Sequence, residues 1–249
     1  MKKIVNLPKI ADPSIEQVLE EFLSEQSKKL KTKTVSGYRD VIQLFEDCMN
    51  GYAYQGLSEA EEALFDKYYN AEGIEHKEFC QLFGPEKIPE NTGEFLGYFM
   101  IQKVMAGGDF KRLAGTVIKK LSKWLAEKAY ISEEDAAMGT EEGATAARDL
   151  PKAEKAGDIL YKAAEAVDFD PDELDDADYH DFDHYTIEKV EPGKLWLEVY
   201  DKKGKSAVGP IAVPKKATIL LQKGWDISCT IARIRGKWRI VEFANVYPQ

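Results

Sequence analysis

The spacing of apolar residues changes once along this chain, and that change limits the folds open to it. Up to about residue 131, apolar side chains recur at intervals of three and four, which is the spacing of one helix face. From Tyr185 onward they alternate with polar side chains, as in a strand with one buried face. A helical pattern does not serve as a strand pattern. The sequence therefore predicts an α+β protein, with an all-α region followed by a β region.

Start and stop signals divide the first region into helices. Asp12-Pro13 has the form of an N-cap followed by proline in the first turn, and it predicts a helix that ends near Lys31. Thr34 is the expected cap of a second helix, which Asn50-Gly51 should end. Both helices carry an apolar face that must be covered by other elements.

A capping box and a wide apolar stripe mark the later helices. Ser58 and Glu61 have the capping-box spacing and open a third helix. Shorter helical pieces are expected at 75–83 and 94–106, and Asp109 starts the last helix. Because strand signals are missing from this region, we predict an all-α orthogonal bundle.

Turn residues divide the second region into five strands. Pro192-Gly193, Lys203-Gly204 and Gly236 are turn signals, and residues 214–222 have the pattern of a short helix. The strands are predicted at 185–191, 194–200, 207–213, 225–235 and 237–246. Five strands with a helix between the third and the fourth fit a small OB-like barrel, and an SH3-like barrel is the alternative.

The net charge of −10 is distributed unevenly. Residues 1–130 carry a net charge of −2, residues 131–185 carry −14, and residues 186–249 carry +6. The acidic middle, rich in Ala, Gly, Asp and Glu, predicts a linker with room for one amphipathic helix at 152–167. The predicted organisation is a helical domain, an acidic linker and a barrel domain over residues 1–131, 132–184 and 185–249.

Two motifs in the helical region resemble a known domain. Thr34-Val35-Ser36-Gly37-Tyr38 follows a basic turn, and Thr116-Val117-Ile118-Lys119-Lys120-Leu121-Ser122-Lys123-Trp124-Leu125 is followed by Tyr130-Ile131. In this order they resemble the SAM-like core-binding domain that precedes the catalytic domain in phage integrases and other tyrosine recombinases. The resemblance covers residues 12–131, about half of the chain.

That resemblance implies a DNA-binding surface, since the core-binding domain forms one half of a clamp around duplex DNA. Contacts are expected from the second and the last helices. The matching cations near the second helix are Lys28, Lys29, Lys31, Lys33 and Arg39, and those on the last helix are Arg112, Lys119 and Lys123. Helical geometry supports the second set, because residues 119 and 123 lie within about 20° of residue 112 around the helix. A row of this kind could track phosphates, and the alternative is an ordinary solvated helix face.

The residues for recombinase chemistry are missing from the sequence. The family requires a His-x-x-Arg unit, and none of the three histidines, His76, His180 and His184, is followed by arginine at that spacing. Phosphate-binding loops, nucleophile elbows and zinc-protease motifs are also missing. We therefore predict a protein that is not an enzyme and has no cofactor. A metal-dependent enzyme using His180 and His184 is a remote third possibility.

The three cysteines and the N-terminal residues indicate a cytoplasmic protein. Cys48, Cys80 and Cys229 are an odd number without a C-x-x-C pair, which predicts buried thiols rather than a disulfide framework. The first residues lack the pattern of a secretory signal, and the chain has no apolar run long enough for a membrane span. We expect no membrane partner.

Cations and aromatic rings recur together in the barrel region. Strand alternation predicts that Leu195, Leu197 and Val199 face inward and that Trp196 and Tyr200 face outward. Four cations flank the last hairpin: Arg233, Arg235, Lys237 and Arg239. Such a mixture is typical of a groove that stacks the bases of single strands. The alternative is that Trp196 and Trp238 close the open ends of the barrel.

The sequence as a whole predicts a non-catalytic protein that binds DNA, duplex or single-stranded, through the helical domain and the basic barrel. The alternative is a protein-interaction or regulatory adaptor that kept the helical fold without DNA binding. For the acidic run, a plain solubilising linker is favoured. A second reading is that its carboxylates fold back on the basic barrel and compete there with nucleic acid.

Overall fold

The computed structural model describes residues 7–169, 175, 178–201 and 204–249. Contacts divide the chain into two units, and each is discussed separately. The helical unit comprises Met1–Phe99 and Leu113–Ala147, and the barrel unit comprises Met100–Arg112 and Arg148–Gln249. This division differs from the boundaries predicted at residues 131 and 184, because residues of the predicted linker contribute to both units.

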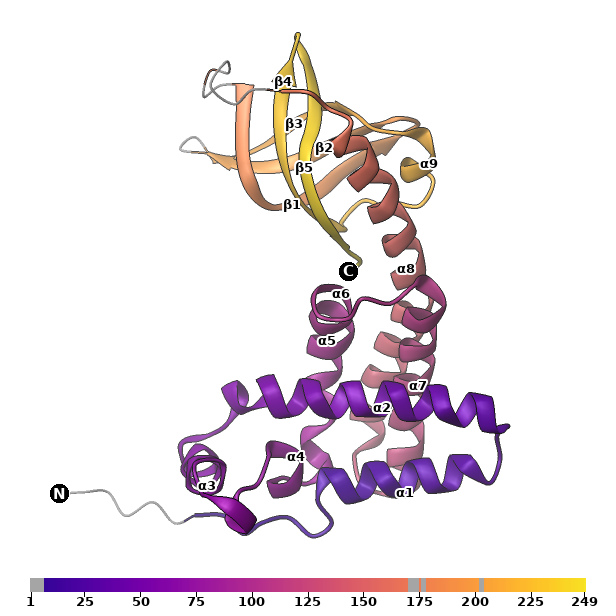
Figure 1. Ribbon diagram of the computed structural model, residues 1–249, viewed down its shortest axis with the longest axis vertical. Helices are drawn as coiled ribbons and strands as arrows, with labels where there is room; N and C mark the ends of the chain where they lie inside the picture. The colour runs from indigo at the N-terminus through magenta and orange to yellow at the C-terminus, as the bar shows by residue number, and fades with distance from the viewer. Residues whose placement is uncertain (1–6, 170–174, 176–177, 202–203) are drawn as a thin grey trace, which may run out of the picture. The chain divides into compact units, whose positions relative to one another are not determined.

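In its described residues, the helical unit is built from helices alone (Figure 1). Its elements up to residue 99 are α1 (Ile15–Ser27), α2 (Thr32–Tyr52), η1 (Ala53–Gly56), α3 (Glu59–Tyr69), η2 (Gly73–Glu75), α4 (Phe79–Leu82), η3 (Pro85–Lys87), η4 (Pro89–Asn91), α5 (Thr92–Glu94) and the π-helical η5 (Phe95–Phe99). The ring centroids of Phe45 and Phe95 lie 4.9 Å apart, and those of Phe22 and Trp124 lie 5.4 Å apart. The prediction of an all-helical first region is confirmed.

The helix starts differ in part from the predicted ones. Ser14, and not Asp12, caps α1: the Ser14 N–H donates to the Gln17 side chain at 2.7 Å, and the Gln17 N–H donates to the Ser14 hydroxyl at 3.4 Å. Pro13 therefore precedes the helix instead of occupying its first turn. In contrast, the predicted capping box of α3 is confirmed, because the Ser58 N–H and hydroxyl donate to Glu61 at 2.9 and 2.7 Å.

Helix α2 is longer than predicted at both ends. It begins at Thr32, before the predicted cap Thr34, and continues through Asn50-Gly51 to Tyr52. The Asn50 side chain accepts a hydrogen bond from the Cys80 N–H at 2.9 Å. The asparagine therefore links α2 to α4 instead of ending the helix.

Helices α7 (Gly108–Glu127) and α8 (Glu133–Glu165) show where the linker prediction is wrong. Residues 133–165 form one helix of 33 residues, although only 152–167 were predicted as helical. Within the helical unit α8 packs on α7 through glycines. A Cβ on Gly115 would lie 2.5 Å from the Gly143 carbonyl oxygen, and one on Gly143 would lie 2.6 Å from the Gly115 carbonyl oxygen. Small residues carry this contact, so a search for large apolar side chains at helical spacing misses it.

The barrel unit contains the five predicted strands (Figure 1). They are β1 (Tyr179–Glu191), β2 (Lys194–Asp201), β3 (Gly204–Ala212), β4 (Asp226–Ile234) and β5 (Lys237–Tyr247). The short helices α6 (Met100–Gln102) and α9 (Lys215–Thr218) also belong to this unit. Strand β1 starts six residues before the predicted residue 185, and α9 is shorter than the predicted 214–222.

The strands pair in the order β1-β2-β3-β5-β4, and β1 also pairs with β4 and closes the barrel. The β3–β5 pair is parallel and the others are antiparallel. This order, with α9 between β3 and β4, corresponds to the OB-like alternative. Inside, Leu195, Leu197 and Ile231 are fully buried, and Ala156 and Leu160 of α8 join the same core. The predicted α+β class is confirmed.

Within the described residues, we find no helix that combines the length and the apolar character required to cross a membrane.

Candidate nucleic-acid interface

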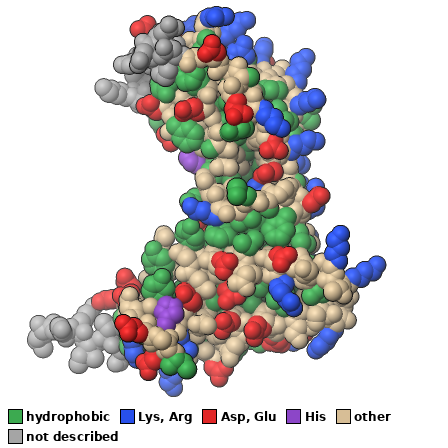
Figure 2. Space-filling view, viewed as in Figure 1, with side chains coloured by type: hydrophobic (Ala, Val, Ile, Leu, Met, Phe, Trp, Pro, Cys, Tyr) green, Lys and Arg blue, Asp and Glu red, His purple; other side chains and the backbone are tan. Residues whose placement is uncertain are grey.

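The lysines at the turn from α1 to α2 are exposed. Lys28, Lys29 and Lys31 lie in this turn, with Lys31 as the N-cap of α2, and Lys33 lies in the first turn of that helix. Figure 2 shows Lys and Arg side chains gathered at this end of the two helices. The structure thus brings together four of the cations that the sequence analysis selected.

Arg39 lies in a different environment. It lines a groove of about 650 Å³ between α1 and α2, together with the carboxylates of Glu16, Glu20 and Glu46. A phosphate that approached Arg39 here would also meet these three carboxylates. The surroundings of Arg39 therefore disfavour a contact with DNA.

The predicted row on α7 is divided by the fold. Arg112 belongs to the barrel unit and forms an ion pair with Asp109 at 2.8 Å. Lys119 and Lys123 belong to the helical unit, and only Lys123 is exposed. A Cβ on Gly143 would lie 2.6 Å from the backbone nitrogen of Lys119, which shows how closely α8 covers that position. Lys119 is half-buried as a result, and the three cations do not share one unit.

The hairpin of β4 and β5 presents the four predicted barrel cations. Arg233, Arg235 and Lys237 are exposed, and Arg239 is half-buried. The chain reverses at Arg235-Gly236, where φ is 50° and 75°, and Ile234 pairs with Lys237 across the turn. Positive φ at two successive residues is the geometry of a tight hairpin turn. We call these four residues, Arg233, Arg235, Lys237 and Arg239, the hairpin cluster.

Two acidic residues of the predicted linker lie beside this cluster. A cavity of about 370 Å³ is lined by Arg235, Lys237 and Arg239 and also by Asp168. Arg233 forms an ion pair with Asp178 at 3.5 Å. The other acidic residues of the run, from Asp170 to Asp176, lie outside the described residues except Asp175.

A second surface covers the outer side of β1, β2 and β3. Leu195, Leu197 and Val199 point inward and are buried, as the alternation predicted. On the outer side, the Lys189 Nζ lies 4.6 Å from the centroid of the Trp196 ring. A Cβ on Gly209 would lie 2.6 Å from that ring, so glycine is required for the indole to lie against β3.

This outer surface forms an open cavity of about 560 Å³, lined by Trp196, Lys189, Val190, Ala207, Lys223 and Glu188. Tyr200 of β2 is 76% exposed, and it pairs with Lys205 of the neighbouring strand β3. We call the set Lys189, Trp196, Tyr200, Lys205 and Lys223 the Trp196 face. Sequence reasoning missed its three lysines, because Lys189 of β1, Lys205 of β3 and Lys223 before β4 come beside the rings only in the folded barrel.

Carboxylates are present on the Trp196 face as well. Lys205 pairs with Glu198 at 2.6 Å, and Lys223 pairs with Glu188 at 2.9 Å. The hydrogen bond from Lys223 is the main cause that lowers the pKa of Glu188. Both side chains of the Lys223–Glu188 pair are exposed, and ion pairs at exposed positions contribute about 0–1 kcal/mol. A phosphate can therefore replace Glu188 beside Lys223 at little cost.

The other tryptophan of the sequence analysis lies differently. Trp238 is half-buried against the barrel core, and its ring centroid lies 5.4 Å from that of His180. Trp238 thus fits the alternative in which an aromatic ring helps to close the barrel. Trp196 does not, because it lies on the outer side.

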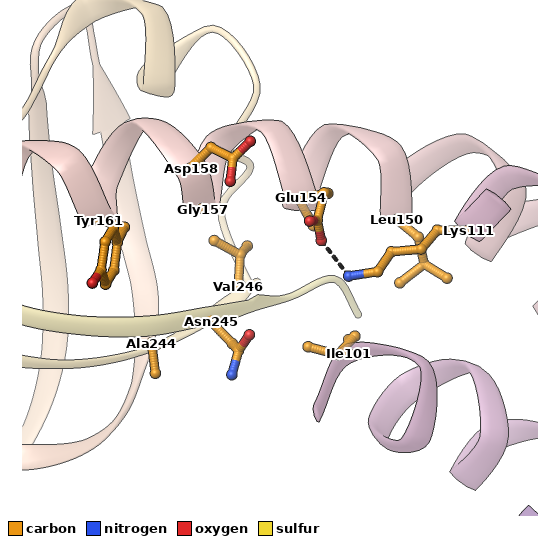
Figure 3. A pocket seen from close by; sticks show the side chains of 11 residues that line it. Ile101, Lys111, Leu150, Glu154, Gly157, Asp158, Tyr161, Ala244, Asn245 and Val246 are labelled. Carbon is orange, nitrogen blue, oxygen red and sulfur yellow. Dashed lines mark hydrogen bonds and ion pairs between the residues drawn. The ribbon is translucent and has the colours of Figure 1, made fainter. Parts of the chain in front are cut away.

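Figure 3 shows a polar cavity in the barrel unit that the sequence did not indicate. Its volume is about 200 Å³, and α8 and the end of β5 form two of its sides. Lys111, only 5% exposed, donates to Glu154 inside it. Asp158, Tyr161 and Asn245 also line it. A lysine near the start of a predicted helix gives no sequence signal of burial, so this ion pair emerges only from the packing of α7 on α8.

The remaining candidate chemistry is not assembled. Cys48, Cys80 and Cys229 are buried free thiols, as predicted, and burial raises the pKa of Cys48 to about 12. His184 lies with its ring 4.8 Å from that of Tyr247. No cluster of three or more His, Cys, Asp or Glu side chains suited to a metal ion occurs in the part of the chain that the structure describes.

Comparison of the chain with protein-family models, with curated proteins and with solved structures finds no match.

Proposed function

We propose that the barrel unit binds single-stranded nucleic acid through the Trp196 face and the hairpin cluster. The observation that carries the proposal is the outward indole of Trp196, which lines an open cavity between Lys189 and Lys223. An aromatic ring of this kind accepts a base by stacking, which contributes about 1–3 kcal/mol per base. Lysines beside it can neutralise the phosphates that flank the base.

The positive net charge of the barrel region supports this proposal, although the net charge of the complete chain is negative. Residues 186–249 carry a net charge of +6, whereas the complete chain carries −10. A phosphate backbone responds to charges within about 8–10 Å at ordinary salt, and not to the total charge. Figure 2 shows Lys and Arg side chains along one edge of the barrel unit.

Single strands are favoured over duplex DNA by the kind of contact available. Stacking on Trp196 and Tyr200 requires bases that are not already paired and stacked in a duplex. The clamp for duplex DNA that we predicted in the helical unit is the weaker candidate. Its lysines at the turn from α1 to α2 are exposed, but Arg39 lines a groove with three carboxylates and Lys119 is half-buried. No recombinase or other catalytic activity is part of the proposal.

Fluorescence anisotropy tests the proposal directly. The full chain is titrated into a fluorescein-labelled 20-nucleotide oligo(dT) and into a duplex of equal length, at about 50 mM salt. Trp196→Ala should weaken oligo(dT) binding by about 5- to 150-fold through the loss of one stacked base. Tyr161→Ala, which removes a half-exposed ring elsewhere in the same unit, is the matched control and should change affinity less than twofold.

A second variant guards against a folding defect at Trp196. Lys189→Glu with Lys223→Glu keeps the indole in place and should reduce affinity while leaving the circular dichroism spectrum unchanged. The proposal fails if the wild-type chain does not bind oligo(dT), or if both sets of variants bind as tightly as the wild type.

A further inference from the structure

The groove between α1 and α2 has an apolar floor and an acidic lining. Buried Leu19 and Ile42 form the floor of the groove, and half-buried Leu23 is the part of this floor that a ligand can reach most easily. Glu16 and Glu20 lie on α1 and Glu46 on α2, and all three line the groove. Figure 2 shows acidic side chains spread over the face formed by these two helices.

The carboxylates of this lining have little compensation from cations. Burial first, and then the carboxylates of Glu16, Asp47 and Glu20, raise the pKa of Glu46. Glu16 accepts a hydrogen bond from the neutral Gln81 side chain at 3.1 Å. Among the described residues neither Glu20 nor Glu46 forms an ion pair.

Arg39 also lines the groove, together with the three carboxylates of Glu16, Glu20 and Glu46. One positive charge therefore faces three negative charges in the lining. The groove as a whole is negative.

We propose that this groove binds a helical segment of a partner protein that carries lysines or arginines beside apolar residues. An amphipathic helix inserts its apolar side chains into a groove between two helices through positions three and four apart. Residues 16 to 27 of α1 span about 16 Å, which corresponds to about three turns of a bound helix. Its cations would meet Glu16, Glu20 and Glu46.

A nucleic acid is a poor occupant of the same groove, because its phosphates would meet the three carboxylates. The inference is independent of the proposed function, since the groove belongs to the helical unit and the nucleic-acid site to the barrel unit. The inference gives the helical unit a separate role. It also names the kind of protein that the predicted adaptor would bind.

The test uses two fluorescein-labelled synthetic peptides of 16 residues, one a helical repeat of leucine and lysine and the other with glutamate in place of every lysine. Binding to the full chain is followed by anisotropy at about 50 mM salt. The variant Glu16→Gln with Glu20→Gln and Glu46→Gln removes three charges with little change in shape. Its matched control, Glu62→Gln with Glu72→Gln and Glu75→Gln, removes three exposed charges of the same unit outside the groove.

The basic peptide should bind the wild-type chain and the acidic peptide should not. The groove variant should lose at least tenfold in affinity for the basic peptide, and the control variant should lose less than twofold. Leu23→Ser should also weaken binding, because it removes the accessible part of the floor. Oligo(dT) affinity should be the same in all of these variants, which separates this test from that of the barrel.

Three results would overturn the inference. They are absence of binding by the basic peptide, an equal loss in the groove and control variants, and a dimer in sedimentation that only the groove variant abolishes. The last result would identify a second copy of this chain as the occupant.

Discussion

Arg39 and Lys119 of the helical unit and the hairpin cations of the barrel unit look alike in the sequence but differ in their surroundings. In the helical unit, Arg39 shares a groove with three glutamates, and Lys119 is half-buried beneath α8. In the barrel unit, Arg235 and Lys237 are exposed at the tip of a hairpin. The number of cations in a sequence is therefore a poor guide to a binding surface. The elements packed around each cation determine whether a ligand can reach it.

Lys119 is half-buried because α8 packs against α7. Disrupting this packing should cause the largest loss of stability among the variants considered. Gly115→Leu places a side chain where a Cβ already lies 2.5 Å from the Gly143 carbonyl oxygen. We expect it to lower the free energy of unfolding by about 3 kcal/mol or more, measured by urea denaturation. A loss much smaller than this would mean that α8 does not pack on α7 at Gly115. Lys119 would then be exposed, and the predicted DNA contact through Lys119 would be possible again.

Gly51→Ala is the control for this variant. Gly51 lies in α2, and a Cβ there would meet nothing within 4 Å. Replacing a helical glycine by alanine without steric conflict should raise stability by roughly 0.5–1 kcal/mol. Equal losses from both substitutions would mean that the close contact between α7 and α8 does not exist.

The buried pair of Lys111 and Glu154 sharpens the comparison within the barrel unit. Glu154→Gln leaves the Lys111 ammonium, only 5% exposed, without its carboxylate. We expect a loss of about 2 kcal/mol in urea denaturation. Lys111→Met should cost less, because the Glu154 side chain is 32% exposed and water can solvate it.

Exposed Asp158, one turn further along α8, supplies the comparison. Asp158→Asn should change the free energy of unfolding by less than about 0.5 kcal/mol. A similar small change for Glu154→Gln would contradict the assignment of Lys111 as a buried cation that requires a counter-ion.

Removing a charge from the acidic groove should give the smallest change in stability, and this change should be a gain. Because the pKa of Glu46 in the folded state is raised above its ordinary value of 4.5, the favourable contribution of its proton is present at low pH. This contribution is lost as the pH rises through the folded-state pKa. Glu46→Gln should therefore raise stability at pH 7 by roughly 0.2–0.5 kcal/mol, the size of a like-charge pair on a surface.

The pH dependence of that gain is the check. Thermal unfolding of the wild type and Glu46→Gln at pH 7 and at pH 4 should show the difference shrinking at the lower pH, where the folded state keeps more of its Glu46 carboxyl groups neutral than at pH 7. A gain that stays constant between the two pH values would show that charge is not its cause.

The features predicted well from the sequence are those that depend on residues close to one another in the chain. Alternation from Leu195 to Val199 predicted the inner and outer sides of β2, and the spacing of Ser58 and Glu61 predicted a capping box. Both depend on neighbours within a few residues. They are therefore visible in a single sequence.

The features that were missed depend on contacts between distant segments. Gly115 and Gly143 bring two helices together without any apolar signal, and this explains why residues 133–151 were assigned to a linker. The lysines of the Trp196 face come from β1, β3 and the segment before β4, and only strand pairing makes them neighbours of Trp196. Burial of Lys111 likewise follows from packing alone.

The most direct test of the central contrast is a comparison of two charge-reversed sets in oligo(dT) binding. One variant carries Arg235→Glu and Lys237→Glu in the barrel unit, and the other carries Arg39→Glu and Lys123→Glu in the helical unit. The account predicts at least a tenfold loss and a shallower salt dependence for the first, and less than a twofold change for the second. A larger loss in the helical variant than in the barrel variant would contradict it.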